Sequence, residues 1–198
     1  MSEYGKFFMQ KTIFRSEKTA WLAAGIYTII LYSTLTVAFD AYVSVYDQIG
    51  RASMSRWINL AFAAAGVILL LWILLSIRPR LSGCIALLLI ILIIAFCLHH
   101  LKIPAKRFHF FQYAPLTLIL FDAIKFRSKD RGKYVWTLAL VALIGLGDES
   151  IQLMLPERHF GVLDLVINSA AGLLTLVFIG FVWGEENYPS LRPVTGSR

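Results

Sequence analysis

The sequence predicts an all-α membrane protein: a polytopic transmembrane helical bundle of about six helices with both termini in the cytoplasm. Of its 198 residues, 58% are hydrophobic and only 16% are charged, and the mean hydropathy is +0.70. Six apolar runs approach the roughly 20 residues that a helix needs to cross a bilayer. Lysine and arginine are distributed unequally between the connecting segments, as they are in membrane proteins of fixed orientation.

The first three runs are predicted helices without an evident chemical role. The first covers residues 19–39 and is longer than the apolar core of a signal peptide, so we expect a retained helix. The second and third, 57–77 and 81–99, are almost purely aliphatic, as in Val67-Ile-Leu-Leu-Leu-Trp-Ile-Leu-Leu, and Arg78-Pro79-Arg80 links them tightly. Such sequences are typical of helices that face lipid.

The last three runs, 109–126, 135–155 and 162–183, carry polar and ionisable residues within apolar sequence. These groups cost free energy in hydrocarbon and are usually kept for a use. One of them, Asp122, is predicted to pair with the nearby Lys125 near the end of its helix, which counts against a polar pathway through the membrane. The sequence therefore divides into a three-helix scaffold (1–103), a three-helix core (104–183) and a short cytoplasmic tail (184–198).

Lysine and arginine set the predicted orientation. Thirteen lie in the N-terminus, the second-to-third link, the fourth-to-fifth loop and the tail, against six in the alternate segments. Basic short loops stay in the cytoplasm, so the net charge of +7 is mainly a topology signal. A nucleic-acid partner is not expected, because no soluble basic fold is present to carry one.

With this orientation, the polar residues of the last three helices lie within about two turns of the outer surface. The i to i+4 spacing places His109 over Tyr113, and Asp164 over Asn168. Asp148, Glu149 and Gln152 share one arc of the fifth helix. The flanking loops add three further cations, so an outward-facing polar pocket is predicted with the candidate residues Lys106, Arg107, His109, Tyr113, Asp148, Glu149, Gln152, Arg158, Asp164 and Asn168.

In order, the segments His109-Phe-Phe-Gln-Tyr113, Asp148-Glu149-Ser-Ile-Gln152, Arg158 and Asp164-Leu-Val-Ile-Asn168 resemble the signature of the VanZ-like family. The resemblance covers residues 104–182. Where the family tends to show glycines after the asparagine, this chain has Ala171 and Thr175. The family is named for a protein linked to teicoplanin resistance, so the resemblance implies a multi-pass protein of the bacterial inner (cytoplasmic) membrane that acts in envelope physiology or glycopeptide resistance.

Three interpretations of the pocket remain open. As an enzyme on a lipid-linked or peptidoglycan-related substrate, it would use Asp148, Glu149 and His109 for acid/base work, with Arg158 holding a phosphate or carboxylate that Lys106 and Arg107 attract. As a binder, it would hold a lipid headgroup, a cell-wall precursor or a glycopeptide. As a structural feature, Arg158 would neutralise a carboxylate while Tyr113, Gln152 and Asn168 bond helices together. No cofactor is expected, and no metal, since no ligand spacing supports one.

Overall fold

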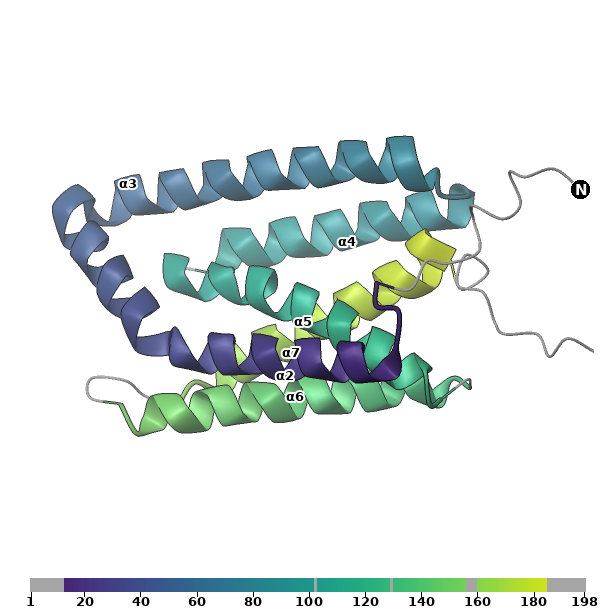
Figure 1. The fold of residues 1–198 in the computed structure, drawn as a ribbon. Coiled ribbons are helices and arrows are strands. Elements are labelled where there is room, and N and C mark those ends of the chain that lie inside the picture. The colour runs from purple at the N-terminus through teal and green to yellow at the C-terminus, as the bar shows by residue number, and fades with distance from the viewer. Residues whose placement is uncertain (1–12, 102, 129, 156–159, 185–198) are drawn as a thin grey trace, which may run out of the picture.

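The computed structural model describes residues 13–101, 103–128, 130–155 and 160–184, and within these ranges every regular element is a helix (Figure 1). Six α-helices follow one another along the chain. Short non-α turns of helix extend three of them: the π-helical Ile73–Ile77 and Phe178–Gly184 (η1 and η3) and the 3₁₀ turn Pro104–Arg107 (η2). The six are α2 (Glu17–Ser33), α3 (Leu35–Trp72), α4 (Leu81–His100), α5 (Phe108–Lys125), α6 (Gly132–Leu153) and α7 (Val162–Val177).

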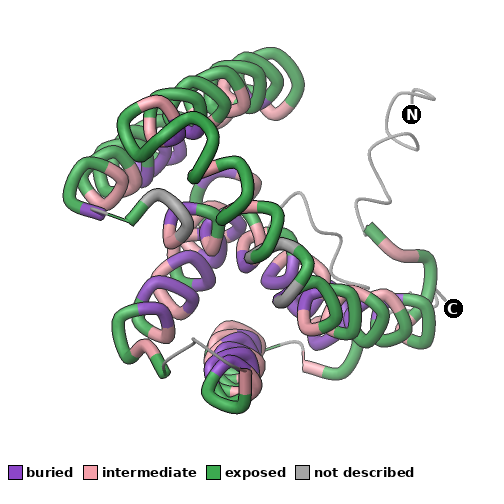
Figure 2. Tube along the Cα trace, turned by 90° about the vertical axis from the view of Figure 1, so that its left-hand side faces the viewer, coloured by how far each residue is buried: buried purple, intermediate pink, exposed green. Residues whose placement is uncertain are grey.

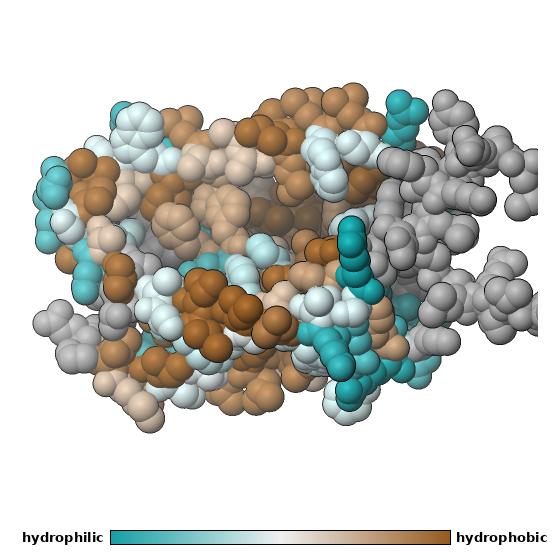
Figure 3. Space-filling view, viewed as in Figure 1, coloured by the Kyte–Doolittle hydropathy of each residue, from teal (hydrophilic) through white to brown (hydrophobic). Residues whose placement is uncertain are grey.

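Four of the described helical segments are long and apolar enough to cross a membrane: Asp40–Ile77, Leu81–His100, Gly132–Leu153 and Val162–Trp183. The chain is therefore a membrane protein by the length and composition of its helices. In the space-filling view, hydrophobic residues cover much of the middle and hydrophilic residues gather toward the two ends (Figure 3). The two remaining helices are shorter or more polar, since α2 has 17 residues and the 18-residue α5 carries His109, Asp122 and Lys125.

Helix α5 is the central element of the fold. It packs against α2, α6 and α7, and α6 packs along α7. Tyr113, Leu116, Val141 and Ala171 are buried where these helices meet, and the end-on view shows buried backbone gathered in this interior (Figure 2). Because α2, α6 and α7 pack around α5, its buried polar side chains face protein rather than lipid. The first helix thus packs with the predicted core of residues 104–183 rather than only with its neighbours in sequence.

The predicted loop between the first two spans is helical instead. Helix α3 runs through residues 40–56 and bends at Gly50, whose φ of 74° and ψ of 164° lie outside helical values. L side chains rarely adopt that conformation, so glycine permits the bend. The part before Gly50 lies across one end of the bundle, and the part after it runs back along the outside (Figure 1). Hydropathy does not reveal this segment, because it contains charges spaced among apolar residues.

Glycines set the spacing between helices in the core. A Cβ atom on Gly172 of α7 would lie 2.9 Å from Cγ1 of Val141 on α6, and one on Gly145 of α6 would lie 3.3 Å from Cβ of Asn168 on α7. These separations are at or below van der Waals contact. Small residues at these positions therefore bring α6 and α7 together closely, as small residues do in membrane helices.

A polar contact ties the start of α2 to the end of α5. Asp122 is fully buried, forms an ion pair with Lys125, and accepts the backbone N–H of Phe14 at 3.0 Å. The predicted pairing of Asp122 with Lys125 is confirmed. In the adjoining turn, a hydrogen bond from the Ser128 hydroxyl and another from the Gly132 N–H lower the pKa of Asp130.

Candidate polar site

The predicted polar residues meet where α5 begins, α6 ends and α7 begins. These three termini lie at one end of the bundle, here called the site end, and the other end is the opposite end (Figure 1). Tyr113, Asp148, Glu149 and Asn168 are each no more than 1% exposed. The helices that carry them pack against one another in all three pairs, so the side chains face a shared interior rather than lipid.

Asp148 joins α6 to α5. The Tyr113 hydroxyl donates to one carboxylate oxygen of Asp148 at 3.0 Å, and the Gln152 amide donates to the other at 3.3 Å. Gln152 stands one turn along α6 from Asp148, so both lie on the same face of the helix. Asp148 is thus held from two sides in a fixed orientation.

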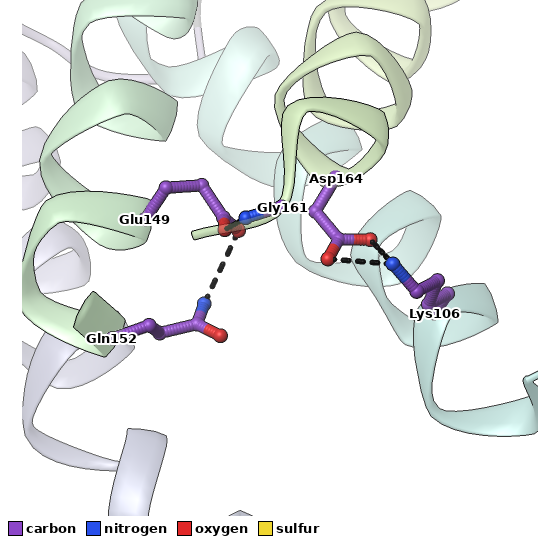
Figure 4. A network of polar contacts seen from close by, with 5 residues as sticks. All are labelled: Lys106, Glu149, Gln152, Gly161 and Asp164. Atoms are coloured by element: carbon purple, nitrogen blue, oxygen red, sulfur yellow. Dashed lines mark hydrogen bonds and ion pairs between the residues drawn. The ribbon is translucent and has the colours of Figure 1, made fainter. Parts of the chain in front are cut away.

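Glu149 joins α6 to the segment that opens α7. The backbone N–H of Gly161 donates to Oε2 of Glu149 at 2.8 Å, and Gln152 donates to Oε1 at 3.3 Å. Figure 4 shows Gly161 between Glu149 and Asp164. A Cβ atom on Gly161 would lie 2.4 Å from Oδ2 of Asp164 and 3.3 Å from Oε2 of Glu149. The backbone of Gly161 has an ordinary φ of −106°, so glycine is needed here for space rather than for conformation.

Lys106 and Asp164 form the cationic contact of the site. The ammonium of Lys106, from the 3₁₀ turn before α5, lies 2.8 Å and 2.9 Å from the two carboxylate oxygens of Asp164 (Figure 4). Their side chains are 22% and 13% exposed, respectively. Because Lys106 bridges both oxygens, its charge is committed to Asp164 and ties the start of α7 to the start of α5.

His109 and Asn168 carry buried polar atoms that the described part of the site leaves without a hydrogen bond. The ring of His109 lies near Asp164, Asp148 and Asn168, and its centroid is 6.2 Å from that of Tyr113. Asn168 is fully buried. The His109 ring and the Asn168 amide are close enough to interact with each other, but no described residue makes a hydrogen bond of normal geometry to Nδ1 of His109 or to either polar atom of the Asn168 amide. A buried amide left unpaired costs roughly 1–3 kcal/mol.

Arg107 does not join the carboxylates, although its neighbour Lys106 does. Its guanidinium donates to Ser55 Oγ at 3.0 Å, to Asn59 Oδ1 at 2.6 Å and to the Leu101 carbonyl at 2.9 Å. Arg107 therefore fastens the start of α5 to α3. The physical reason is that consecutive residues point in different directions around the turn, so only one of the pair faces α7. Arg158, predicted to join this site, lies outside the described residues, as does His159.

Several residues around the site were not anticipated from the sequence. Gly161 contributes a backbone N–H, which no side-chain pattern reveals. Tyr32 of α2 donates from its hydroxyl to the Ile144 carbonyl at 2.7 Å, and Tyr27 donates to the Gln112 carbonyl at 2.9 Å. Tyrosines five residues apart inside an apolar run were a usable signal, because a buried phenol needs a partner. They show that α2 supports the helices carrying the site.

The described residues of the site contain three carboxyl groups, from Asp148, Glu149 and Asp164, against the single ammonium of Lys106. Such a site accepts hydrogen bonds more readily than it donates them. Nowhere in the described ranges do three or more His, Cys, Asp or Glu side chains gather closely enough to hold a metal ion. The described side chains of the site offer hydrogen bonding by carboxylates, two amides and an imidazole.

Comparisons with known proteins leave the family open. No family model, no curated protein and no solved structure matches the chain. The resemblance to the VanZ-like family therefore stays a prediction from the ordered residues of α5, α6 and α7.

Proposed function

We propose that this protein is a VanZ-like component of the bacterial inner membrane whose polar site faces outward and binds the headgroup of a lipid-linked or cell-wall component. The observation that supports the proposal is the unsatisfied amide of Asn168 beside the unsatisfied ring nitrogen of His109, both buried among carboxylates. Buried polar groups are almost always hydrogen-bonded. A bound ligand can form the hydrogen bonds that the described residues do not supply to these two groups.

The chemistry of Asn168 indicates the class of ligand. A carboxamide offers two N–H donors and an oxygen acceptor, so it is best matched by a group that both accepts and donates. Sugar hydroxyls and peptide amides do both. The excess of carboxyl groups over ammonium adds acceptors for further ligand donors. The preferred ligand therefore carries hydroxyl or amide groups, as the sugar and peptide portions of cell-wall precursors do.

The geometry changes the roles expected for the basic residues. Lys106 is paired with Asp164, and Arg107 bonds to α3, so neither is placed to attract a free anion into the site. If the ligand carries a phosphate, Arg158 remains the residue proposed to hold it. This favours recognition through neutral polar groups, with any phosphate at the periphery.

An enzyme is the second candidate, and the open nitrogen of His109 favours it. An imidazole with one unpaired nitrogen near Asp148 and Asp164 is the arrangement that proton transfer to or from a bound substrate requires. Asp148 and Glu149 would orient the substrate, since each already accepts two hydrogen bonds. Binding is proposed first because it needs no group beyond those that the site displays.

A purely structural role is the remaining alternative, and replacement of Asn168 distinguishes it. Asn168→Leu removes the amide with little change in size. If the amide serves a ligand, the variant should accumulate normally and melt at or above the wild-type temperature, because an unpaired buried amide no longer has to be accommodated. In a strain from which the gene has been deleted, this variant should then fail to restore tolerance of teicoplanin or of envelope stress.

Thr175→Val is the matched control. Thr175 is buried two turns further along the same face of α7, and among the described residues its hydroxyl bonds only within its own helix, to the Ala171 carbonyl at 2.8 Å. The Thr175→Val variant should restore teicoplanin or envelope-stress tolerance fully. The lipid-linked disaccharide–peptide precursor, added to purified protein, should remain bound to Thr175→Val in native mass spectrometry and be lost from Asn168→Leu. A destabilised Asn168→Leu protein that still binds the precursor and restores tolerance would contradict the proposal.

A further inference from the structure

A groove lies at the opposite end of the bundle, far along the helices from the polar site. It is an open groove of about 990 Å³ between the start of α4, the start of α6 and η3. In Figure 1 these three segments lie at the same end, next to the short link between η1 and α4. Nothing in the proposed function uses this groove.

Close contacts hold η3 against α4 and α6 beside the groove. A Cβ atom on Gly83 of α4 would lie 2.8 Å from the Phe181 carbonyl oxygen of η3, and one on Gly180 of η3 would lie 3.5 Å from the Tyr134 hydroxyl of α6. The segment η3 is thus set between the two helices. Apolar side chains that line the groove are exposed, since Leu173 of α7 is 51% and Phe181 of η3 is 60% exposed.

The rim of the groove is basic. The exposed residues Arg78, Arg80 and Arg131 line it, and no Asp or Glu is among the described residues that do so. Helix α4 begins directly after Arg80 without a side-chain cap. Its first backbone N–H groups add partial positive charge at the same place. Arginine forks and helix N-termini are both well matched to phosphate oxygens.

Tyr134 and Trp183 also line the groove. Aromatic residues of this kind favour the level of lipid headgroups in membrane proteins. The helices α4 and α6 begin here and η3 ends here. The groove therefore lies at the ends of three segments that are long and apolar enough to cross a membrane. Below the arginines, its wall is formed largely by aliphatic side chains such as Leu138 and Val177.

We propose that this groove binds an anionic phospholipid, with the phosphate at Arg78, Arg80 and Arg131 and an acyl chain along the apolar wall. Charge complementarity selects an anion, and the exposed apolar wall selects a lipid over a soluble phosphate. Basic pockets between membrane helices bind such headgroups in this way. The site is independent of the polar site, so either can fail without the other.

The test compares two double variants of the full-length protein purified in a neutral detergent. Arg78→Gln with Arg131→Gln removes two charges from the groove, and leaves Arg80 in place. The matched control, Arg15→Gln with Lys18→Gln, removes two exposed charges at the same end but outside the groove. Native mass spectrometry measures binding of dioleoyl phosphatidylglycerol and of dioleoyl phosphatidylcholine to each.

The wild-type protein should bind phosphatidylglycerol at least about tenfold more tightly than phosphatidylcholine, and excess inorganic phosphate should not displace it. The groove variant should bind phosphatidylglycerol about 25-fold more weakly, at roughly fivefold per arginine, and the control variant should match wild type. Arg78→Lys with Arg131→Lys keeps the charges and should keep the preference, even if the glutamine variant folds poorly. Equal losses in the groove and control variants, no preference for the anionic lipid, or displacement by inorganic phosphate would each overturn the proposal.

Discussion

At the scale of single residues, the site depends on small groups as much as on charged ones. Gly161 donates its N–H to Glu149 and leaves room for the carboxylate of Asp164, which in turn holds Lys106. The sequence predicted the charged and amide residues from their helical spacing. It did not predict Gly161, because a backbone donor has no side-chain signature, nor the direction of Arg107, because its partners Ser55 and Asn59 come from a distant helix.

Gly161→Ala should destabilise the protein by about 1–3 kcal/mol, the usual cost of overpacking. The added methyl carbon would lie 2.4 Å from Oδ2 of Asp164, so the carboxylate of Asp164 would have to move away from Lys106. The melting temperature of the detergent-solubilised protein measures the effect. Gly25→Ala is the control: Gly25 lies in α2 with nothing within 4 Å of an added Cβ, so it should melt at or slightly above the wild-type temperature. Equal melting temperatures for the two variants would show that the space at Gly161 is not required.

At the scale of elements, apolar runs predicted where helices occur but not how they end or bend. The run at 135–155 corresponds to α6 and that at 162–183 to α7 with η3. The stretch between the first two runs became part of α3 instead of a loop, since a charged helix can form at the end of a bundle where its polar face remains solvated. Contacts between helices, such as α2 against α5, depend on the assembled fold and leave only weak local signals.

The contact between α2 and α6 depends on Gly147. An added Cβ there would lie 2.4 Å from the Tyr32 hydroxyl, which is fixed by its hydrogen bond to the Ile144 carbonyl. Gly147→Ala should therefore lower stability by about 1–2 kcal/mol. In the Tyr32→Phe background the same substitution should cost much less, because the clashing oxygen is gone. Melting curves of the four proteins in this double-mutant cycle measure the coupling, and strictly additive effects would contradict the close approach.

At the scale of the whole molecule, the sequence predicts the orientation through its excess of basic residues in alternate segments. The arrangement of the helices agrees with the alternation of those segments between two ends (Figure 1). In a protein whose Cys84 and Cys97 are replaced by alanine, a membrane-impermeant thiol reagent applied to intact cells should label Phe160→Cys and not Arg131→Cys. Both positions are exposed, so access through the membrane decides the result. The reverse pattern would place the polar site on the cytoplasmic side.

The central claim is that the polar site is completed by a ligand. A structure of the full-length protein extracted with its native lipids tests it most directly. Density that does not belong to the chain should lie within hydrogen-bond distance of both the Asn168 amide and Nδ1 of His109. A site in which residues 156–159 of the chain itself satisfy these atoms, or in which the two groups bond only to each other, would contradict the claim.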